Sequence, residues 1–226
     1  MKFELFTEAE LFTNYENFRS EIRNRFPTRA TELDLMYDAI GDQLIVAPAS
    51  SYEHFHNAFP GGYIDHVLRV VKFSKVLHRT FELCGLITND FTEEELLFAA
   101  FHHDLGKVGL PGFDHYNLNQ NKWSVENTGK IYDHDMNKPW MDVTDQGFYL
   151  LNKFGVKYSL AEMIGIKLTD GMYSESNKPY YTGFNLNTKL RSNIGYILHH
   201  ADLMAYRFEF ERYVKVTDGF KFGYNV

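Results

Sequence analysis

The chain has 226 residues, of which 44% are hydrophobic, and this length and composition suit one globular domain with a sizeable core. The formal net charge of −7 excludes a broad surface for long nucleic acids, because such surfaces need many Lys and Arg contacts to phosphates. A small phosphorylated ligand stays compatible with this charge, since one metal ion and a basic side chain can neutralise it locally.

Cysteine content and the length of apolar runs indicate the cellular location and whether a membrane span is present. Cys84 is the only cysteine, which excludes an internal disulfide and favours a reducing, cytoplasmic location. The first residues carry Glu8 and Glu10 among apolar side chains, unlike the basic start and unbroken apolar run of a signal peptide. No stretch approaches the roughly 18 to 20 uncharged residues of a membrane span. We therefore expect a soluble protein with no membrane partner.

The first part of the chain predicts two helices and a loop. Residues 7–40 place apolar side chains at helical spacing, and Pro27 breaks this run into two helices. Residues 41–62 are predicted to form a loop, because they contain two prolines, two serines and the Gly61-Gly62 pair.

Two predicted helices with histidines follow the loop. Residues 63–83 have mostly helical apolar spacing, which puts His66 in a first helical turn. Thr92 and Glu95 form a capping box at the start of the next helix. Its apolar run LLFAAF leads into a histidine pair and an aspartate, and Gly106 is the predicted stop.

The remainder is predicted as a long loop and three more helical segments. Residues 111–147 are rich in Asn, Asp, Gly and Pro, which indicates a long loop with short helical pieces. Helical patterns return over 148–153, 160–168 and 190–214. No segment alternates apolar and polar residues over a strand's length, so the predicted fold class is all-α.

The run AAFHHDLGK carries the strongest chemical signal. A fully apolar turn leads directly into His103 and Asp104, so these groups are expected to lie against the core. Buried imidazoles and carboxylates need partners, and a divalent metal ion satisfies both kinds of ligand. Two adjacent polar residues at a helix end are usually just solvated, so the motif needs partners elsewhere in the chain.

Three motifs occur in order along the chain: GGYIDH at 61–66, HHDLGK at 102–107 and HHADLM at 199–204. Together they resemble the H…HD…D pattern of the HD superfamily of metal-dependent phosphohydrolases. The resemblance covers about residues 48–205 and is closest to bacterial and phage members with an H-x-A-x-P-G-G-x-x-x-H motif, here His56 to His66. It implies an all-α HD-domain helical bundle with a long loop insertion, as a single domain over 1–226 with 1–47 as an N-terminal helical extension.

The resemblance also implies a metal site formed by His66, His103, Asp104 and Asp202. A bound divalent ion makes water acidic enough to supply hydroxide near neutral pH and neutralises phosphate charge. Asp104 is predicted to be catalytic as well, because it is placed to be both a ligand and an acceptor for that water. Lys107 is the second predicted catalytic residue, placed to reach a phosphate oxygen, although it could simply cap helix carbonyls.

Three further residues are predicted to bind substrate: Arg69, His56 and Asp170. Arg69 lies one turn after His66 and could reach a phosphate, or it could pair with Asp65 at i,i+4. His56 occupies a loop position where related proteins place a histidine near the pocket. Asp170 follows a position that departs from the family.

That departure lies in IGIKLTDGMY, residues 164–173, where related sequences often read H-D-G-x-Y and this chain has Thr169. The family's histidine serves a second metal or the pocket, so Thr169 favours one metal over two. His115 and His134 could compensate, but they lie in a polar stretch and are predicted to be exposed. His102 and His199 are expected to pack or to orient a ligand, and His54 and His78 to be solvated.

The predicted function is metal-dependent release of phosphate from a nucleotide, like a 5'-nucleotidase. The expected cofactor is one divalent transition metal, Mn, Fe, Co, Ni or Zn, and Mg at a second site and homo-oligomer formation stay open. Alternative reactions are hydrolysis of a phosphodiester or of a nucleoside triphosphate, and oxidation by two irons, which Thr169 disfavours. The alternative from another class is a nonhydrolytic nucleotide-binding module.

Overall fold

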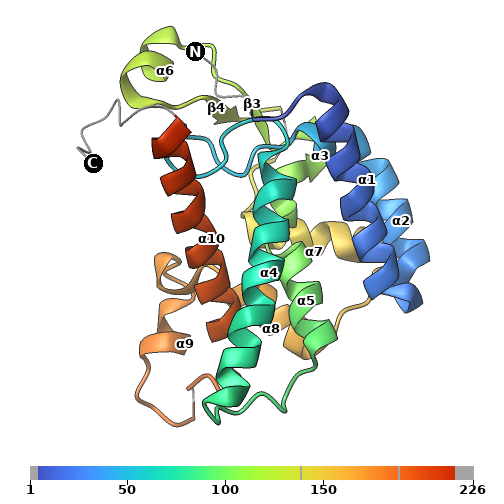
Figure 1. The fold of residues 1–226 in the computed structure, drawn as a ribbon, viewed down its shortest axis with the longest axis vertical. Coiled ribbons are helices and arrows are strands. Elements are labelled where there is room, and N and C mark those ends of the chain that lie inside the picture. Colours follow the sequence, from blue (N-terminus) through green and yellow to red (C-terminus); the bar gives the residue numbers. More distant parts are fainter. Residues whose placement is uncertain (1–4, 138, 188, 217–226) are drawn as a thin grey trace.

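The computed structural model describes residues 5–137, 139–187 and 189–216, so residues 1–4 and 217–226 of the predicted domain lie outside the described residues. The chain is mostly helical, as predicted (Figure 1). None of the described helices combines the length and apolarity that crossing a bilayer requires. The α-helices are α1 (Glu8–Arg25), α2 (Ala30–Ala39), α3 (Gly41–Val46), α4 (Gly62–Leu83), α5 (Glu93–His102), α6 (Lys122–Thr128), α7 (Val143–Lys153), α8 (Leu160–Leu168), α9 (Lys178–Thr182) and α10 (Ile194–Val216).

Shorter elements connect these helices. The 3-10 turns are η1 (Pro27–Arg29), η2 (Leu105–Val108) and η3 (Gly171–Tyr173). The strands are β1 (Gly109–Leu110), β2 (Phe113–Asp114), β3 (Tyr116–Leu118) and β4 (Tyr132–His134). They pair as two antiparallel ribbons, β1 with β2 and β3 with β4.

The long helix α4 lies at the centre of the bundle. It packs against α10 on one side and α5 on the other, and α8 closes the group by contacting both α5 and α10. Helices α1 and α2 lie on the side of α4 away from α10 (Figure 1). Fully buried aromatic side chains such as Phe18, Phe98 and Phe101 fill the space between α1 and α5, with rings in edge-on contact.

The predicted helix boundaries are confirmed where capping chemistry marks them. The first helical segment breaks at Pro27, between α1 and α2. Thr92 caps α5, and Glu95 bonds back to the Thr92 backbone amide at 2.8 Å, which completes the predicted capping box. Helix α5 ends at His102, before the predicted stop at Gly106, because residues 105–108 tighten into η2.

Two predictions of irregular structure were wrong. The predicted loop 41–62 begins with a helical turn, α3. The long insertion contains the expected short helix, α6, but also the β3–β4 ribbon, in which Tyr116 pairs with His134 and Leu118 with Tyr132. Strands of two or three residues are too short to show the alternation that predicts a strand.

The Gly61-Gly62 pair fixes the start of α4. Gly61 adopts φ +79°, a left-handed conformation that favours glycine. A Cβ on Gly62 would lie 2.1 Å from the Asn57 carbonyl oxygen, so the loop can approach the helix this closely only at glycine. The pair therefore sets the position of the helical turn that carries His66.

Candidate metal centre

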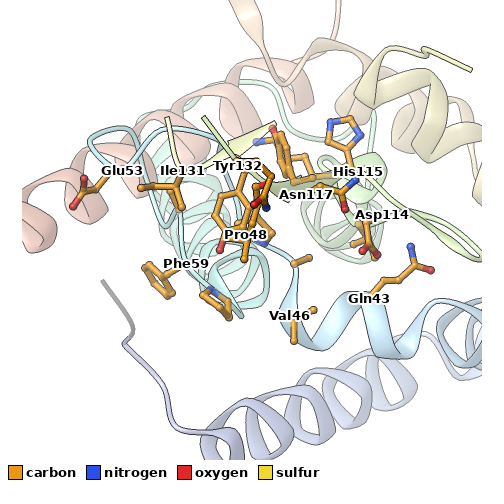
Figure 2. Close-up of a pocket in the computed structure, with 18 residues that line it drawn as sticks. Gln43, Val46, Pro48, Glu53, Phe59, Asp114, His115, Asn117, Ile131 and Tyr132 are labelled. Atoms are coloured by element: carbon orange, nitrogen blue, oxygen red, sulfur yellow. The ribbon is translucent and has the colours of Figure 1, made fainter. Parts of the chain in front are cut away.

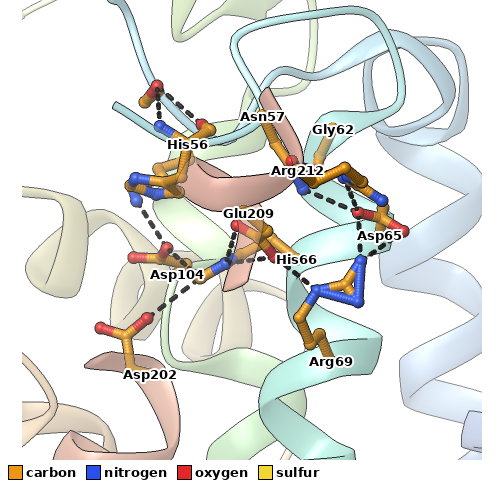
Figure 3. A network of polar contacts seen from close by, with 12 residues as sticks. His56, Asn57, Gly62, Asp65, His66, Arg69, Asp104, Asp202, Glu209 and Arg212 are labelled. Atoms are coloured by element: carbon orange, nitrogen blue, oxygen red, sulfur yellow. Dashed lines mark hydrogen bonds and ion pairs between the residues drawn. The ribbon is translucent and has the colours of Figure 1, made fainter. Parts of the chain in front are cut away.

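Three helices bring His66, His103 and Asp202 together. His66 lies on α4, His103 directly follows α5, and Asp202 lies on α10. One ligand atom from each residue lies within 4.8 Å of the other two. His66 is fully buried and His103 is 3% exposed, so both imidazoles are removed from water. Figure 3 shows His66 between the carboxylates of Asp202 and Glu209.

Backbone and side-chain acceptors orient both imidazoles. His103 Nδ1 lies 2.8 Å from the Ala100 carbonyl oxygen, and His66 Nδ1 lies 3.1 Å from Glu209. Each Nδ1 therefore carries a proton and donates, so Nε2 is the ring nitrogen that faces the cluster. His66 Nε2 lies 3.1 Å from Asp202 Oδ1, but neither Nε2 has a well-aligned hydrogen bond among the described residues. These two buried nitrogens and an Asp202 oxygen are a donor set that fits a divalent metal ion.

Asp104 lies beside this group and pairs with Lys107. Its Oδ2 is 3.6 Å from His66 Nε2 and 3.5 Å from His103 Nε2. Its shortest contact is with Lys107 Nζ, at 2.6 Å. The structure therefore brings all four predicted ligands together, with Asp104 at the edge of the cluster and in contact with the predicted catalytic lysine.

The charges in the cluster support one another. Burial lowers the pKa of His66, but the carboxylates of Glu209 and Asp202 outweigh burial and raise this pKa to about 10. Burial raises the pKa of the Asp104 carboxyl, yet the Lys107 ammonium holds that pKa well below its usual range. Asp104 and Asp202 thus stay ionised although they are buried, whereas His66 holds a second proton that a bound cation would displace.

Glu209 supports His66 from the side opposite the cluster. This glutamate is 1% exposed and accepts hydrogen bonds from His66 Nδ1 and from Arg69 Nε at 3.1 Å. The arrangement matches the carboxylate–histidine–metal triads that fix the tautomer of metal ligands in other proteins. The sequence analysis missed Glu209. A signal existed, because Glu209 lies two helical turns after Asp202 and therefore on the same face of α10.

Arg69, which the sequence predicts to bind substrate, forms ion pairs with carboxylates of α4 and α10. Its guanidinium bonds Asp65 at 2.9 Å as well as Glu209, and it lies over the Phe208 ring. Arg212 bonds the same Asp65 carboxylate at 2.7 Å. The alternative interpretation of Arg69 as an i,i+4 partner of Asp65 therefore describes its contacts, and this ion-pair network locks α4 to α10 behind His66 (Figure 3).

The other predicted site residues line one cavity of about 430 Å³, termed the metal-side cavity. Its wall contains both aspartates of the cluster, Asp104 and Asp202. It also contains three more residues of the predicted site: His56, Lys107 and Asp170. Tyr173, Tyr206 and Phe55 add aromatic surface. A cavity of this size suits a small ligand next to the candidate metal ion.

His56 and Asp170 occupy different parts of that wall. The His56 ring lies 4.9 Å from the His66 ring, and burial and the nearby Lys107 hold its pKa well below the usual range. Burial raises the pKa of Asp170, and the neighbouring carboxylate of Asp104 adds to this effect. His56 is therefore a neutral hydrogen-bonding group at the site, and Asp170 is the carboxyl that most readily keeps a proton.

The remaining histidines have mainly structural contacts. His102 packs in the core on the Phe98 ring, and burial lowers its pKa to about 3. His199 was predicted to pack or to orient Asp202. Its Nδ1 donates to the Thr169 carbonyl oxygen at 2.8 Å, so it stabilises the turn at residues 169–171. The predicted exposure of His115 was wrong, because it is 4% exposed and packs between Tyr116 and His134. His54 and His78, predicted to be solvated, are half-buried.

The comparisons with known proteins give no match: no family model, no curated protein and no solved structure matches this chain. The resemblance to the HD superfamily therefore depends on the three sequence motifs.

Proposed function

We propose that the chain is a metal-dependent phosphohydrolase of the HD type, which releases phosphate from a nucleotide. One observation carries the proposal: two buried imidazoles and the Asp202 carboxylate bring ligand atoms within 4.8 Å of one another at the wall of a cavity, and neither Nε2 has a well-aligned hydrogen bond among the described residues. Buried polar nitrogens without a well-aligned partner are costly, and a bound cation would satisfy both of them. His66, His103, Asp202 and the adjoining Asp104 would hold this ion.

When bound, a divalent ion of the Mn, Fe, Co, Ni or Zn class supplies acidified water and neutralises phosphate charge. The chain's own residues supply the rest of the chemistry. Asp104 is placed to accept a hydrogen bond from the attacking water, and Lys107 to donate to a phosphate oxygen next to it. The water oxygen bonds to phosphorus, the ester P–O bond breaks, and the leaving oxygen takes a proton, for which Asp170, in the wall of the same cavity, is the candidate donor.

A single ion suits the described residues better than two. His66, His103 and Asp202 form the one group of three or more ligand residues found in the described part of the chain. Thr169 donates its hydroxyl to the Gly165 carbonyl oxygen at 2.9 Å and is buried, so it offers no further ligand. The proposal therefore keeps the mononuclear site, and an oxygenase with two irons stays disfavoured.

The test combines metal analysis with a substrate panel. Protein purified without chelator should contain about one transition metal ion per chain. It should release phosphate from nucleoside monophosphates in the presence of at least one of Mn, Co, Ni or Zn. Cyclic dinucleotides and nucleoside triphosphates in the same panel test the alternative hydrolases.

Asp104→Ala should abolish phosphate release without changing the helical circular dichroism spectrum. Asp145→Ala, which removes an exposed carboxylate from the first turn of α7, is the matched control and should leave turnover unchanged. Full turnover by Asp104→Ala, or two irons per chain, would contradict the proposed site. Tight nucleotide binding without any hydrolysis would favour the nonhydrolytic binding module.

A further inference from the structure

We propose that a second cavity, on the other side of Lys107, binds the nucleobase of a nucleoside monophosphate. This inference rests on the proposed function and names the substrate class more narrowly. The cavity has a volume of about 470 Å³ and lies between residues 46–60 and the β3–β4 ribbon (Figure 2). We call it the ribbon cavity. Its size is within the range of sites for small organic ligands.

The two walls of the ribbon cavity are joined by backbone hydrogen bonds. The amide of Glu53 donates to the Gly129 carbonyl at 2.7 Å, and the amide of Ile131 donates to the Ser51 carbonyl at 2.9 Å. Tyr52 and Lys130 form an antiparallel bridge beside them. The long insertion is therefore fixed to the loop that carries His56, so the cavity has a defined shape and not a variable gap between loops.

Lys107 connects the ribbon cavity to the metal centre. It lines both cavities, and its Nζ contacts Asp104 at 2.6 Å. A phosphate held by Lys107 beside the cluster would thus have the ribbon cavity directly on its other side. The organic group of a phosphate ester can extend there without displacing the metal ligands.

The lining of the ribbon cavity has the chemistry that recognises a base. Phe59, Tyr116 and Tyr132 provide aromatic surface, and flat bases stack on such rings. Gln43 and Asn117 provide side-chain amides that can read donors and acceptors on a base edge. The metal-side cavity has no amide side chain among its described lining residues.

Gln43 gives a second, independent sign of a missing ligand. Its Oε1 accepts from the Gly112 amide at 3.3 Å. Its Nε2 is buried and has no hydrogen-bond partner among the described residues. A buried amide donor without an acceptor is unfavourable, and a base carbonyl or ring nitrogen would supply one. Figure 2 shows Gln43 beside Asp114 at one end of the cavity and Glu53 at the other.

The charges limit the number of phosphates. In the described lining of the two cavities, Lys107 is the only lysine or arginine. Glu53 and Asp114 add negative charge to the ribbon cavity. One lysine and one divalent ion can compensate the charge of a single phosphate, whereas a triphosphate would place further negative charge near these carboxylates. The inference is therefore a monophosphate with a neutral base.

The experiment fills the ribbon cavity and measures binding with hydrolysis-resistant probes. The probes are four nucleoside 5'-phosphonates, with methylphosphonate as the probe that lacks a nucleoside, titrated calorimetrically into the full chain with Mn²⁺. Val46→Trp should fill the cavity from the end of α3, where Val46 is 47% exposed. Val76→Trp makes the same change on α4, at a residue 53% exposed and outside both cavities, and is the matched control.

The unaltered chain should bind at least one nucleoside phosphonate about tenfold or more tightly than methylphosphonate, since stacking of one base is worth this much. Val46→Trp should lose that preference and keep its affinity for methylphosphonate, and Val76→Trp should keep both. Leu118→Trp fills the cavity from β3 and gives a second reading if Val46→Trp does not fold.

The inference would be overturned if the chain bound nucleoside phosphonates no more tightly than methylphosphonate, or if this preference survived filling of the ribbon cavity. An equal loss of the preference in Val76→Trp would overturn it too. Hydrolysis of p-nitrophenyl phosphate separates this outcome from failure of the proposed function. A chain that cleaves this small ester but ignores cavity filling would have the proposed metal chemistry without the proposed base site. A chain that binds bases as expected but cleaves no ester would refute only the hydrolase.

Discussion

Two buried glutamates, Glu209 behind the candidate metal centre and Glu162 on α8, show how similar burial can serve different purposes. They are 1% and 2% exposed, and each pairs with an arginine. Glu162 accepts two hydrogen bonds from Arg29 at 2.8 Å and 2.9 Å and one from the Ser159 amide at 2.7 Å. All of these donors belong to the scaffold, so Glu162 caps α8 and ties it to η1.

Glu209 differs in its second partner. That partner is His66, whose other ring nitrogen faces the cluster of ligand atoms. The carboxylate thus fixes the imidazole so that its lone pair points at one place in space. Burial and ion pairing alone therefore do not mark a functional carboxylate. What marks it is a partner with a second, unsatisfied atom.

The largest effect on metal affinity is expected from removing that partner. His66→Ala deletes a fully buried ligand, so metal content should fall from about one ion per chain to a trace. His200→Ala, which removes an exposed imidazole from α10, should retain the full metal content. Plasma emission spectrometry of dialysed protein measures both. Normal metal content in His66→Ala would place the ion elsewhere.

Because His66→Ala also leaves Glu209 without its histidine, a second variant keeps this test independent of folding. Asp202→Asn preserves side-chain volume at a partly exposed ligand and removes only the anionic oxygen. It should weaken metal binding strongly while its melting temperature without metal stays close to that of the unaltered chain. Both variants together separate loss of a ligand from loss of structure.

A smaller effect on metal affinity is expected from Glu209→Gln. Glutamine keeps the size of the side chain but replaces the anion that orients His66, and such changes typically cost about 10- to 100-fold in metal affinity. Competition with a chromophoric chelator measures this loss. The absorption spectrum of the Co²⁺-loaded variant should keep its shape, because the same atoms still coordinate. An unchanged affinity would reduce Glu209 to a packing residue.

Local signals explain how much of the fold was predictable from the sequence. The break at Pro27 and the capping box of Thr92 and Glu95 depend on residues within one helical turn, and both appear as predicted. The β3–β4 ribbon depends on pairing between Tyr116–Leu118 and Tyr132–His134, which lie more than a dozen residues apart. Three-residue strands contain no periodic pattern, so only the tertiary structure reveals them.

The candidate site divides in the same way. His66, His103, Asp104 and Asp202 belong to ordered motifs, and the structure brings them together as the sequence analysis expected. His115 was predicted to be exposed because the residues around it are polar. It is buried because the long insertion folds over itself, and the composition of the insertion does not show this. The contacts of Arg69 were undecided for another reason. The sequence alone offers both Asp65 and a phosphate as partners of its guanidinium, and it does not show the contact with Glu209, which comes from a distant helix.

The smallest effect on metal affinity is expected from Glu162→Gln, the counterpart of Glu209→Gln in the scaffold. The variant loses the charged bonds to Arg29, but that arginine keeps Glu94 at 3.2 Å and is partly solvated. The expected loss of folding free energy is therefore about 2 kcal/mol, less than the loss when a fully buried ion pair is broken. In a chain of this length that corresponds to a drop of about 4–8 °C in melting temperature.

The metal affinity of Glu162→Gln should match that of the unaltered chain, because Glu162 contacts no predicted metal ligand among its described partners. If Glu162→Gln weakened metal binding as much as Glu209→Gln, the distinction between the two glutamates would fail, and general stability would account for both.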